Sequence, residues 1–299
     1  MLLEPECLGC LIDQICKALI LLRPSIKKEL IIDCQKKMMD YLTKTEVLSK
    51  PGPLIGKKAY EFIAETLGET DPYKTLKDQY NCLALEYYDK AKEIIDKAED
   101  PLFEAIAIAA IGNTIDFGAH HDMNLIRDLE NFSPEDFKIN DIAKLKINLE
   151  RSNKSGGQIL ILGDNAGEIV FDKLLIITLK RLYPNLDIIY SVRAGPIIND
   201  ATIEDAKFVG LTDIVKVIEA PATPGIELSI ANEEFKKYFY ANGDGIILSK
   251  GQGNFESLYG IEPLFKEVYY LLKAKCPLME RIFNVKIGDL IFKKKTSSF

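Results

Sequence analysis

Two polar stretches in the second half of the chain contain the residues best suited to chemistry. Asp164 and Asn165 stand in GDNAGE directly after an apolar run, and Asp200 ends RAGPIIND after a second run. Carboxylate and amide oxygens are hard ligands that suit an octahedral divalent ion such as Mg²⁺ or Mn²⁺. A carboxylate at the start of a helix would repel a phosphate unless a cation stood between them. The three residues therefore predict a metal site that accepts a phosphate oxygen.

A third polar stretch, SKGQGNFE, supplies Lys250 after another apolar run. Its glycines allow backbone N–H groups to approach an anion, and the lysine can bind the remaining phosphoryl oxygens. A metal-bound water would attack phosphorus in line while a site carboxylate takes its proton. This combination predicts hydrolysis of phosphomonoesters, with Asp164, Asp200 and Lys250 as catalytic residues. Covalent attack by Asp164 itself is the alternative.

These stretches follow short β-branched runs that alternate with helical segments. Strands are predicted at 159–162, 188–192, 214–218, 246–248 and 267–275, with a last one near the C-terminus, and helices near 168–183, 201–209, 232–240 and 278–284. Such alternation indicates a parallel sheet with right-handed crossovers. In the common 3-2-1-4 strand order, the loops after the first, second and fourth strands meet at the carboxyl edge. The three polar stretches lie in those loops.

The first half of the chain is predicted to be helical almost throughout. Helical spacing of apolar residues predicts helices at 7–22, 25–43, 57–67 and 73–97, with 50–56 as a loop. Asp100 is predicted to cap a buried helix that has Pro101 in its first turn. A polar, glycine-containing segment at 148–157 is predicted to link the halves. We expect a helical region (1–150) and a Rossmann-like α/β domain (151–299) with a mainly parallel sheet in a three-layer sandwich.

Composition excludes several classes of protein. The chain has 299 residues, of which 47% are hydrophobic and 28% charged, as in a soluble globular protein. The net charge of −7 argues against a broad nucleic-acid surface. The apolar runs fall far short of the roughly 20 residues that span a bilayer, and the N-terminus lacks the pattern of a secretory signal. We therefore expect a cytoplasmic protein that binds neither nucleic acid nor membrane.

Six cysteines are too sparse for a disulfide scaffold in a chain of this length. Cys7 and Cys10 form a Cys-x-x-Cys pair, but no second such pair or paired histidine motif follows. We therefore expect buried thiols or one disulfide in preference to a zinc site.

Four motifs, in order, resemble those of the metal-dependent damage-control phosphatases, a family catalogued as domain of unknown function 89. GDNAGE, RAGPIINDAT and KGQGNFE resemble its three α/β motifs, and AAIGNTIDFG resembles its helical Gly-Asn-x-x-Asp motif. The opening ECLGCLIDQ is similar to that of its stand-alone prokaryotic members. The resemblance covers almost the whole chain. It implies a helical region packed on a Rossmann-like domain, and hydrolysis of small phosphorylated, often damaged, metabolites.

The resemblance also implies a role for individual residues. The implied ligands of a divalent ion (Mg, Mn, Co or Ni) and the phosphate-binding lysine are Asp164, Asn165, Asp200 and Lys250. The implied substrate-binding positions are Asn113, Asp116, Glu168, Arg193, Lys250 and Asn254. A salt bridge to Asp200 or Glu168 is the alternative for Arg193, and an internal hydrogen-bonded pair is the alternative for Asn113 and Asp116. Ala110 and Ile111 replace a tryptophan of eukaryotic relatives, so their preference for sugar phosphates does not carry over.

Other functions remain as alternatives. A haloacid-dehalogenase-type phosphatase needs a second Asp two residues after its nucleophile, whereas Ala166 holds that position. An S-adenosylmethionine-dependent carboxyl methyltransferase, an activity that the resemblance also raises, needs a free glycine turn but not Lys250. A noncatalytic protein would bind a phosphorylated metabolite and metal without releasing phosphate. The sequence favours neither a monomer nor a homodimer.

Overall fold

The computed structural model describes residues 1–47, 49–112, 133–241, 244–261 and 266–296. Its centre is one seven-stranded sheet with the order β1-β7-β6-β5-β2-β3-β4. The strands are β1 (Phe137–Asn140), β2 (Gln158–Leu162), β3 (Asp187–Arg193), β4 (Lys216–Ala220), β5 (Ile246–Lys250), β6 (Glu267–Lys273) and β7 (Leu290–Lys294). All neighbouring strands are parallel except β6 and β7. The four strands β4-β3-β2-β5 have the predicted 3-2-1-4 order, which confirms the predicted fold class.

The central strands are buried on both faces, as is typical of a parallel sheet. Along β2, Ile159 and Ile161 contribute to the hydrophobic core on one face, and Leu160 and Leu162 to the core on the other. Successive side chains of a strand point to opposite faces, so a continuous apolar run is required here. The four side chains are fully buried. Helices must therefore cover both faces of the sheet.

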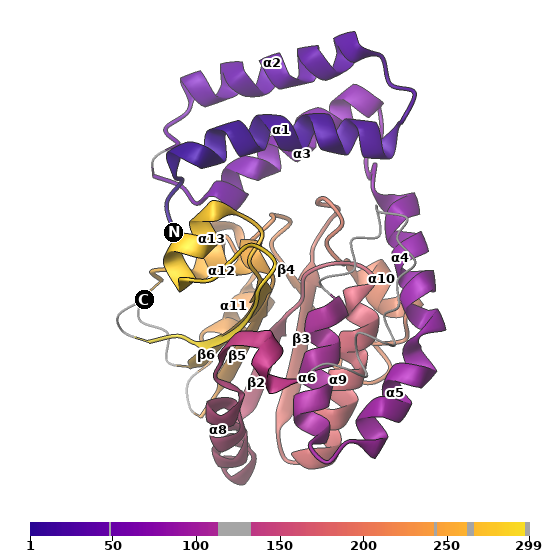
Figure 1. The fold of residues 1–299 in the computed structure, drawn as a ribbon, viewed down its shortest axis with the longest axis vertical. Coiled ribbons are helices and arrows are strands. Elements are labelled where there is room, and N and C mark those ends of the chain that lie inside the picture. The colour runs from indigo at the N-terminus through magenta and orange to yellow at the C-terminus, as the bar shows by residue number, and fades with distance from the viewer. Residues whose placement is uncertain (48, 113–132, 242–243, 262–265, 297–299) are drawn as a thin grey trace.

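Two helical layers supply that cover (Figure 1). The helices of the first core are α4 (Lys74–Glu86), α5 (Tyr88–Lys97), α6 (Pro101–Gly112), α8 (Ile142–Ser155), α9 (Glu168–Leu182) and α10 (Ile203–Phe208). Those of the second core are α11 (Glu233–Phe239), α12 (Gln252–Leu258) and α13 (Pro277–Phe283). Two 3₁₀ turns, Pro134–Asp136 and Leu228–Ile230, complete the connections. The result is the predicted three-layer sandwich.

A third group of helices forms its own core above the carboxyl edge of the sheet (Figure 1). It consists of α1 (Pro5–Leu22), α2 (Lys28–Lys44) and α3 (Gly52–Leu67). Its apolar cluster also contains Ile197, which belongs to the loop after β3. This loop therefore connects the helical group to the edge where ligands bind in such sheets.

The buried helix α6 is present as predicted. Asp100 accepts a hydrogen bond from the N–H of Phe103 at 3.2 Å, which caps the first turn. Gly112 lies so close to α9 that a Cβ atom there would come within 2.8 Å of Phe171. No helix in the described residues is long and apolar enough to cross a membrane.

Several predicted boundaries were wrong. The segment 73–97 is two helices that separate at Tyr87: both pack against α9, but α4 also contacts α10 and α5 also contacts α6. The expected loop at 50–56 already contains the start of α3, with Pro53 in its first turn. Most of the expected linker at 148–157 is helix α8. The short strand β1 was not anticipated, since only its pairing with β7 defines it.

The division into 1–150 and 151–299 stays a prediction. Both β1 and most of α8 come before residue 151, yet β1 pairs with the sheet and α8 packs on β5 and β7.

Candidate metal and phosphate site

The loops after β2 and β3 are joined by backbone hydrogen bonds. Ala166 N–H donates to the Asn199 carbonyl at 2.9 Å, and Ala201 N–H donates to the Asp164 carbonyl at 2.8 Å. Asn165 and Asp200 form an isolated antiparallel bridge. The structure therefore brings the three predicted metal ligands together from two different loops. Asn165 and Asp200 are 35 residues apart in the sequence (200 − 165).

The loop after β5 packs directly against this pair. Gly251 has a φ of 80°, and a Cβ atom there would overlap the Asp164 carboxylate. Asn254 donates to the carbonyls of Gly163 at 3.1 Å and Lys250 at 2.8 Å. The glycine is thus required both for its backbone conformation and for the close approach of Asp164.

Asn165 presents its amide group to carboxylates. Its Nδ2 donates to Asp164 at 3.0 Å and to Glu168 at 2.7 Å. The amide oxygen receives no hydrogen bond from the described part of the chain. Because the nitrogen is held by the two carboxylates, the amide oxygen remains available, and an oxygen of this kind suits a hard cation.

Arg193 forms the salt bridge that was the alternative to a substrate contact. Its Nε donates to Asp200 Oδ2 at 2.6 Å, and its other nitrogens donate to Asn254 at 2.8 Å and to the Gly225 carbonyl at 3.2 Å. Arg193 is only 2% exposed. Arg193 therefore holds the carboxylate of Asp200 from the buried side of the loop. A role in binding substrate stays a prediction for Arg193 and Asn254.

Lys250 is also buried behind the loops. Its Nζ is 3.1 Å from Glu168 and forms a second ion pair with Asp172, which also accepts a 2.7 Å hydrogen bond from Tyr190. Burial alone would lower the pKa of Lys250, but the charges of Asp172 and Glu168 raise it above its usual value. Lys250 is fully buried in this structure, so direct binding of phosphate stays a prediction.

Negative charge is in excess at the site. Burial raises the pKa of Glu168 to about 7 against the opposing charge of Lys250, and raises that of Asp200 to about 7 against Arg193. The charge of Asp164 contributes to both of these shifts. Among the buried or half-buried groups, four carboxylates (Asp164, Glu168, Asp172 and Asp200) lie beside two cations (Lys250 and Arg193), so acidic groups outnumber basic groups by two before the exposed Lys275 is counted. The residues present therefore fit a divalent cation.

A cavity of about 490 Å³ opens above these loops. Asp164, Asn165, Asn199 and Asp200 line its sheet side, and residues of α1 and α3 line the opposite side. Lys275, two residues beyond the end of β6, also lines it and is exposed. Its positive charge lowers the pKa of Asp200. Lys275 was not among the predicted site residues, although its position at the end of the strand predicted at 267–275 was a signal.

Three further expectations concern this region. Asn113 and Asp116 lie outside the described residues, so their predicted roles stay predictions. All six cysteines are free, which does not support a disulfide. Among the described residues, no three His, Cys, Asp or Glu side chains form a metal-binding group, either around Cys7 and Cys10 or around Asp164 and Asp200, so the predicted metal site relies on the amide of Asn165 as its third protein ligand.

Fold and site together define an α/β protein with an acidic cavity at the carboxyl edge of its sheet. Residues 3–291 match the model of the damage-control phosphatase ARMT1-like domain. The chain belongs to this family, as its motifs predicted. An uncharacterized protein from Methanocaldococcus jannaschii is 33% identical over 98% of this chain and 95% of that protein. A damage-control phosphatase from Pyrococcus horikoshii is 32% identical over 97% of each.

A solved structure agrees with this assignment. The crystal structure of a DUF89 family protein from Pyrococcus horikoshii has a TM-score of 0.83 and 28% identity, and the match covers 99% of this chain and 100% of that one.

Proposed function

We propose that the protein is a divalent-metal-dependent phosphatase of small phosphorylated, possibly damaged, metabolites. The observation that carries this proposal is the cluster in which four carboxylates outnumber two buried cations, with Asp164 and Asp200 lining the cavity. A relative from Pyrococcus horikoshii and another from Archaeoglobus fulgidus, 29% identical over 98% of this chain and 99% of that protein, are named damage-control phosphatases. The names support phosphatase activity, and the charge supports its dependence on a metal.

Asp164, Asn165 and Asp200 would hold the ion, which could be Mg²⁺, Mn²⁺, Co²⁺ or Ni²⁺. When bound, a divalent ion neutralises phosphoryl charge and makes a bound water more acidic. Arg193 fixes Asp200 in position through its 2.6 Å ion pair. A carboxylate of the cluster takes the proton of the attacking water.

The two lysines have different roles in this proposal. Lys275 lines the cavity and is exposed, so its ammonium group can bind phosphoryl oxygens directly. Lys250 contributes a buried positive charge that holds Glu168 and Asp172 beneath the loop. Loss of Lys250 would therefore disturb the site from below.

One observation favours the phosphatase over the methyltransferase. A Cβ atom at Gly163 would overlap the hydroxyl group of Tyr190, so this glycine serves the packing of β2 against β3. A methyltransferase needs a glycine turn that is open to the amino-acid part of its cofactor. Gly163 is not among the residues that line the cavity.

The test is a screen of phosphorylated metabolites for release of phosphate, with each of the four metals. We expect activity to disappear with EDTA and to return when the divalent ion is restored. Asp164→Ala is the control variant, because it removes a ligand from the cavity floor. Release of phosphate that survives chelation, or equal rates for wild type and Asp164→Ala, would refute the proposed centre. Metal-independent methyl transfer would support the alternative.

A further inference from the structure

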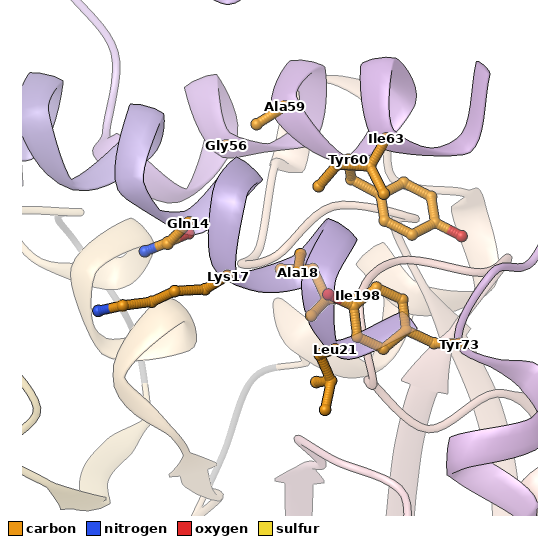
Figure 2. A pocket seen from close by; sticks show the side chains of 10 residues that line it. All are labelled: Gln14, Lys17, Ala18, Leu21, Gly56, Ala59, Tyr60, Ile63, Tyr73 and Ile198. Carbon is orange, nitrogen blue, oxygen red and sulfur yellow. The ribbon is translucent and has the colours of Figure 1, made fainter. Parts of the chain in front are cut away.

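A second cavity, of about 260 Å³, lies beside the candidate site between α1 and α3 (Figure 2). It is lined by Gln14, Lys17, Ala18, Leu21, Gly56, Ala59, Tyr60, Ile63, Tyr73 and Ile198. Three of these residues, Gln14, Gly56 and Ile198, also line the first cavity. The two spaces are therefore neighbours with shared walls.

The second cavity differs from the first in its chemistry. Its wall is formed mainly by aliphatic side chains and by Tyr60 and Tyr73, whose ring centroids are 6.3 Å apart. Figure 2 shows the two tyrosines on one side and Gln14 and Lys17 on the other. No acidic side chain is among the described residues that line it. Such a surface binds an apolar or aromatic group rather than a cation.

One of the three residues shared by the two cavities, Ile198, belongs to the same loop as Asp200. Ile198 has a φ of 46°, a left-handed conformation that is rare for a β-branched residue. Such strain persists where the surroundings over-determine the backbone, and it is concentrated at functional sites. Ile197 anchors the loop in the core of the helical group, while Asn199 and Asp200 face the first cavity. A group bound in the second cavity would thus contact the loop that carries a predicted metal ligand.

We propose that the second cavity binds the apolar part of the substrate whose phosphate group lies in the first cavity. The inference rests on the proposed function and narrows its substrate class to phosphomonoesters with an alkyl or aromatic group. The shared walls carry the argument, because one molecule can extend past Gly56 and Ile198 from the acidic floor to the tyrosines.

Gly56 offers a direct test. It lies inside α3, and a Cβ atom there would meet only Leu11, at 3.6 Å, an ordinary contact. Gly56→Leu therefore narrows the passage while it removes a poor helix former. Gly9→Leu is the matched control, since Gly9 lies inside α1 with nothing within 4 Å of an added Cβ. Circular dichroism establishes that both variants are folded.

The first measurement is calorimetric titration with n-alkylphosphonates from methyl to hexyl in the presence of Mn²⁺. These probes carry the phosphoryl charge but are not hydrolysed. In wild type and Gly9→Leu, we expect the affinity to rise about three- to fourfold with each methylene group that is buried. In Gly56→Leu, we expect the affinity to change less than twofold over the series. The corresponding alkyl phosphates should show the same trend in kcat/KM.

The outcomes separate this inference from the proposed function. Phosphate release that does not depend on the length of the alkyl group would refute the inference and leave the phosphatase assignment intact. Tighter binding of longer phosphonates, without turnover of any phosphate ester, would support the inference and refute the activity. An affinity that does not depend on length, together with a dimer that Gly56→Leu abolishes, would assign the cavity to a second copy of the chain and refute the inference. Absence of phosphonate binding would also refute it.

Discussion

Arg193 and Asp200 form a buried ion pair, with Nε 2.6 Å from Oδ2 and both residues at most 5% exposed. Arg193→Ala would leave the carboxylate of Asp200 without its cation and Asn254 without a donor. Breaking such a pair costs about 3–5 kcal/mol. We expect this loss in the free energy of unfolding from urea denaturation, and weaker binding of Mn²⁺. A loss below about 1 kcal/mol would show that the pair is not important for stability.

Lys275 is expected to bind the phosphoryl group. Lys275→Ala should raise KM for a phosphomonoester by about tenfold or more, because a charged hydrogen bond is lost. Lys273→Ala is the control, since Lys273 ends β6 and does not line the cavity. Steady-state kinetics would measure both variants. Equal KM values for the two would remove Lys275 from the proposed site.

Asn81 on α4 is expected to position the loop after β2 and helix α10, which follows the loop after β3. Its amide oxygen accepts a hydrogen bond from Gly167 N–H at 2.7 Å, and its Nδ2 donates to Asp205 at 2.8 Å. Asn81→Ala leaves the buried Gly167 N–H without a partner, which costs about 1–3 kcal/mol, and removes one of the hydrogen bonds to Asp205, which keeps those from Thr202. We expect a lower free energy of unfolding and a weaker affinity for Mn²⁺ in titration.

Asn148→Ala is the matched control for Asn81→Ala. Asn148 is also buried and donates to the Tyr269 hydroxyl at 2.6 Å, but it does not line the cavity. The Asn148→Ala variant should have a lower free energy of unfolding but an unchanged affinity for Mn²⁺. If both variants lost affinity for Mn²⁺ equally, Asn81 would contribute only to the stability of the fold and not to the position of the predicted metal ligands.

Gly251→Ala should disrupt the site, because the new methyl group would overlap the Asp164 carboxylate. Gly68→Ala is a control for a positive φ alone: Gly68 lies in the left-handed helical region, with φ 70° and ψ 29°, and an added Cβ there meets nothing within 4 Å. Gly251, with φ 80° and ψ 157°, lies in a region that is essentially restricted to glycine. Gly68→Ala should therefore lose about 1 kcal/mol of stability through its backbone, and Gly251→Ala should lose more. Only Gly251→Ala should also lose affinity for Mn²⁺ and release of phosphate. Retention of both properties would contradict the close packing of Gly251 on Asp164.

Lys266 predicts a dependence of stability on pH. Burial lowers the pKa of Lys266 to about 8, although the charge of Asp187 opposes the shift. Between about pH 8 and the unfolded value of 10.5, the unfolded chain therefore binds more protons than the folded chain. The free energy of unfolding should rise with pH in this window, by at most about 1.4 kcal/mol per pH unit.

Urea denaturation at several pH values would measure this rise, and Lys266→Met should lack it. Identical pH dependence in the wild type and the variant would mean that Lys266 keeps its ordinary pKa in the folded protein.

The sequence alone determined the alternation of strands and helices, the order of the central strands and the family. These features follow from local patterns, because a buried parallel strand requires a continuous apolar run and polar loops must follow it. The sequence also predicted correctly that the loops containing Asp164 and Asp200 would meet. Their meeting is a consequence of strand order, which the crossover rules restrict.

The directions of the charged side chains were decided only by the tertiary structure. Lys250 ends a strand that faces the site, yet it is buried between Glu168 and Asp172, which lie one turn apart on α9. Lys275, which no motif contains, lines the cavity instead. The sequence pattern of a strand predicts where a residue lies in the sheet. The groups that surround its side chain belong to elements that are distant in the sequence. Packing of those elements determines whether a charge is buried in an ion pair or remains available to a ligand.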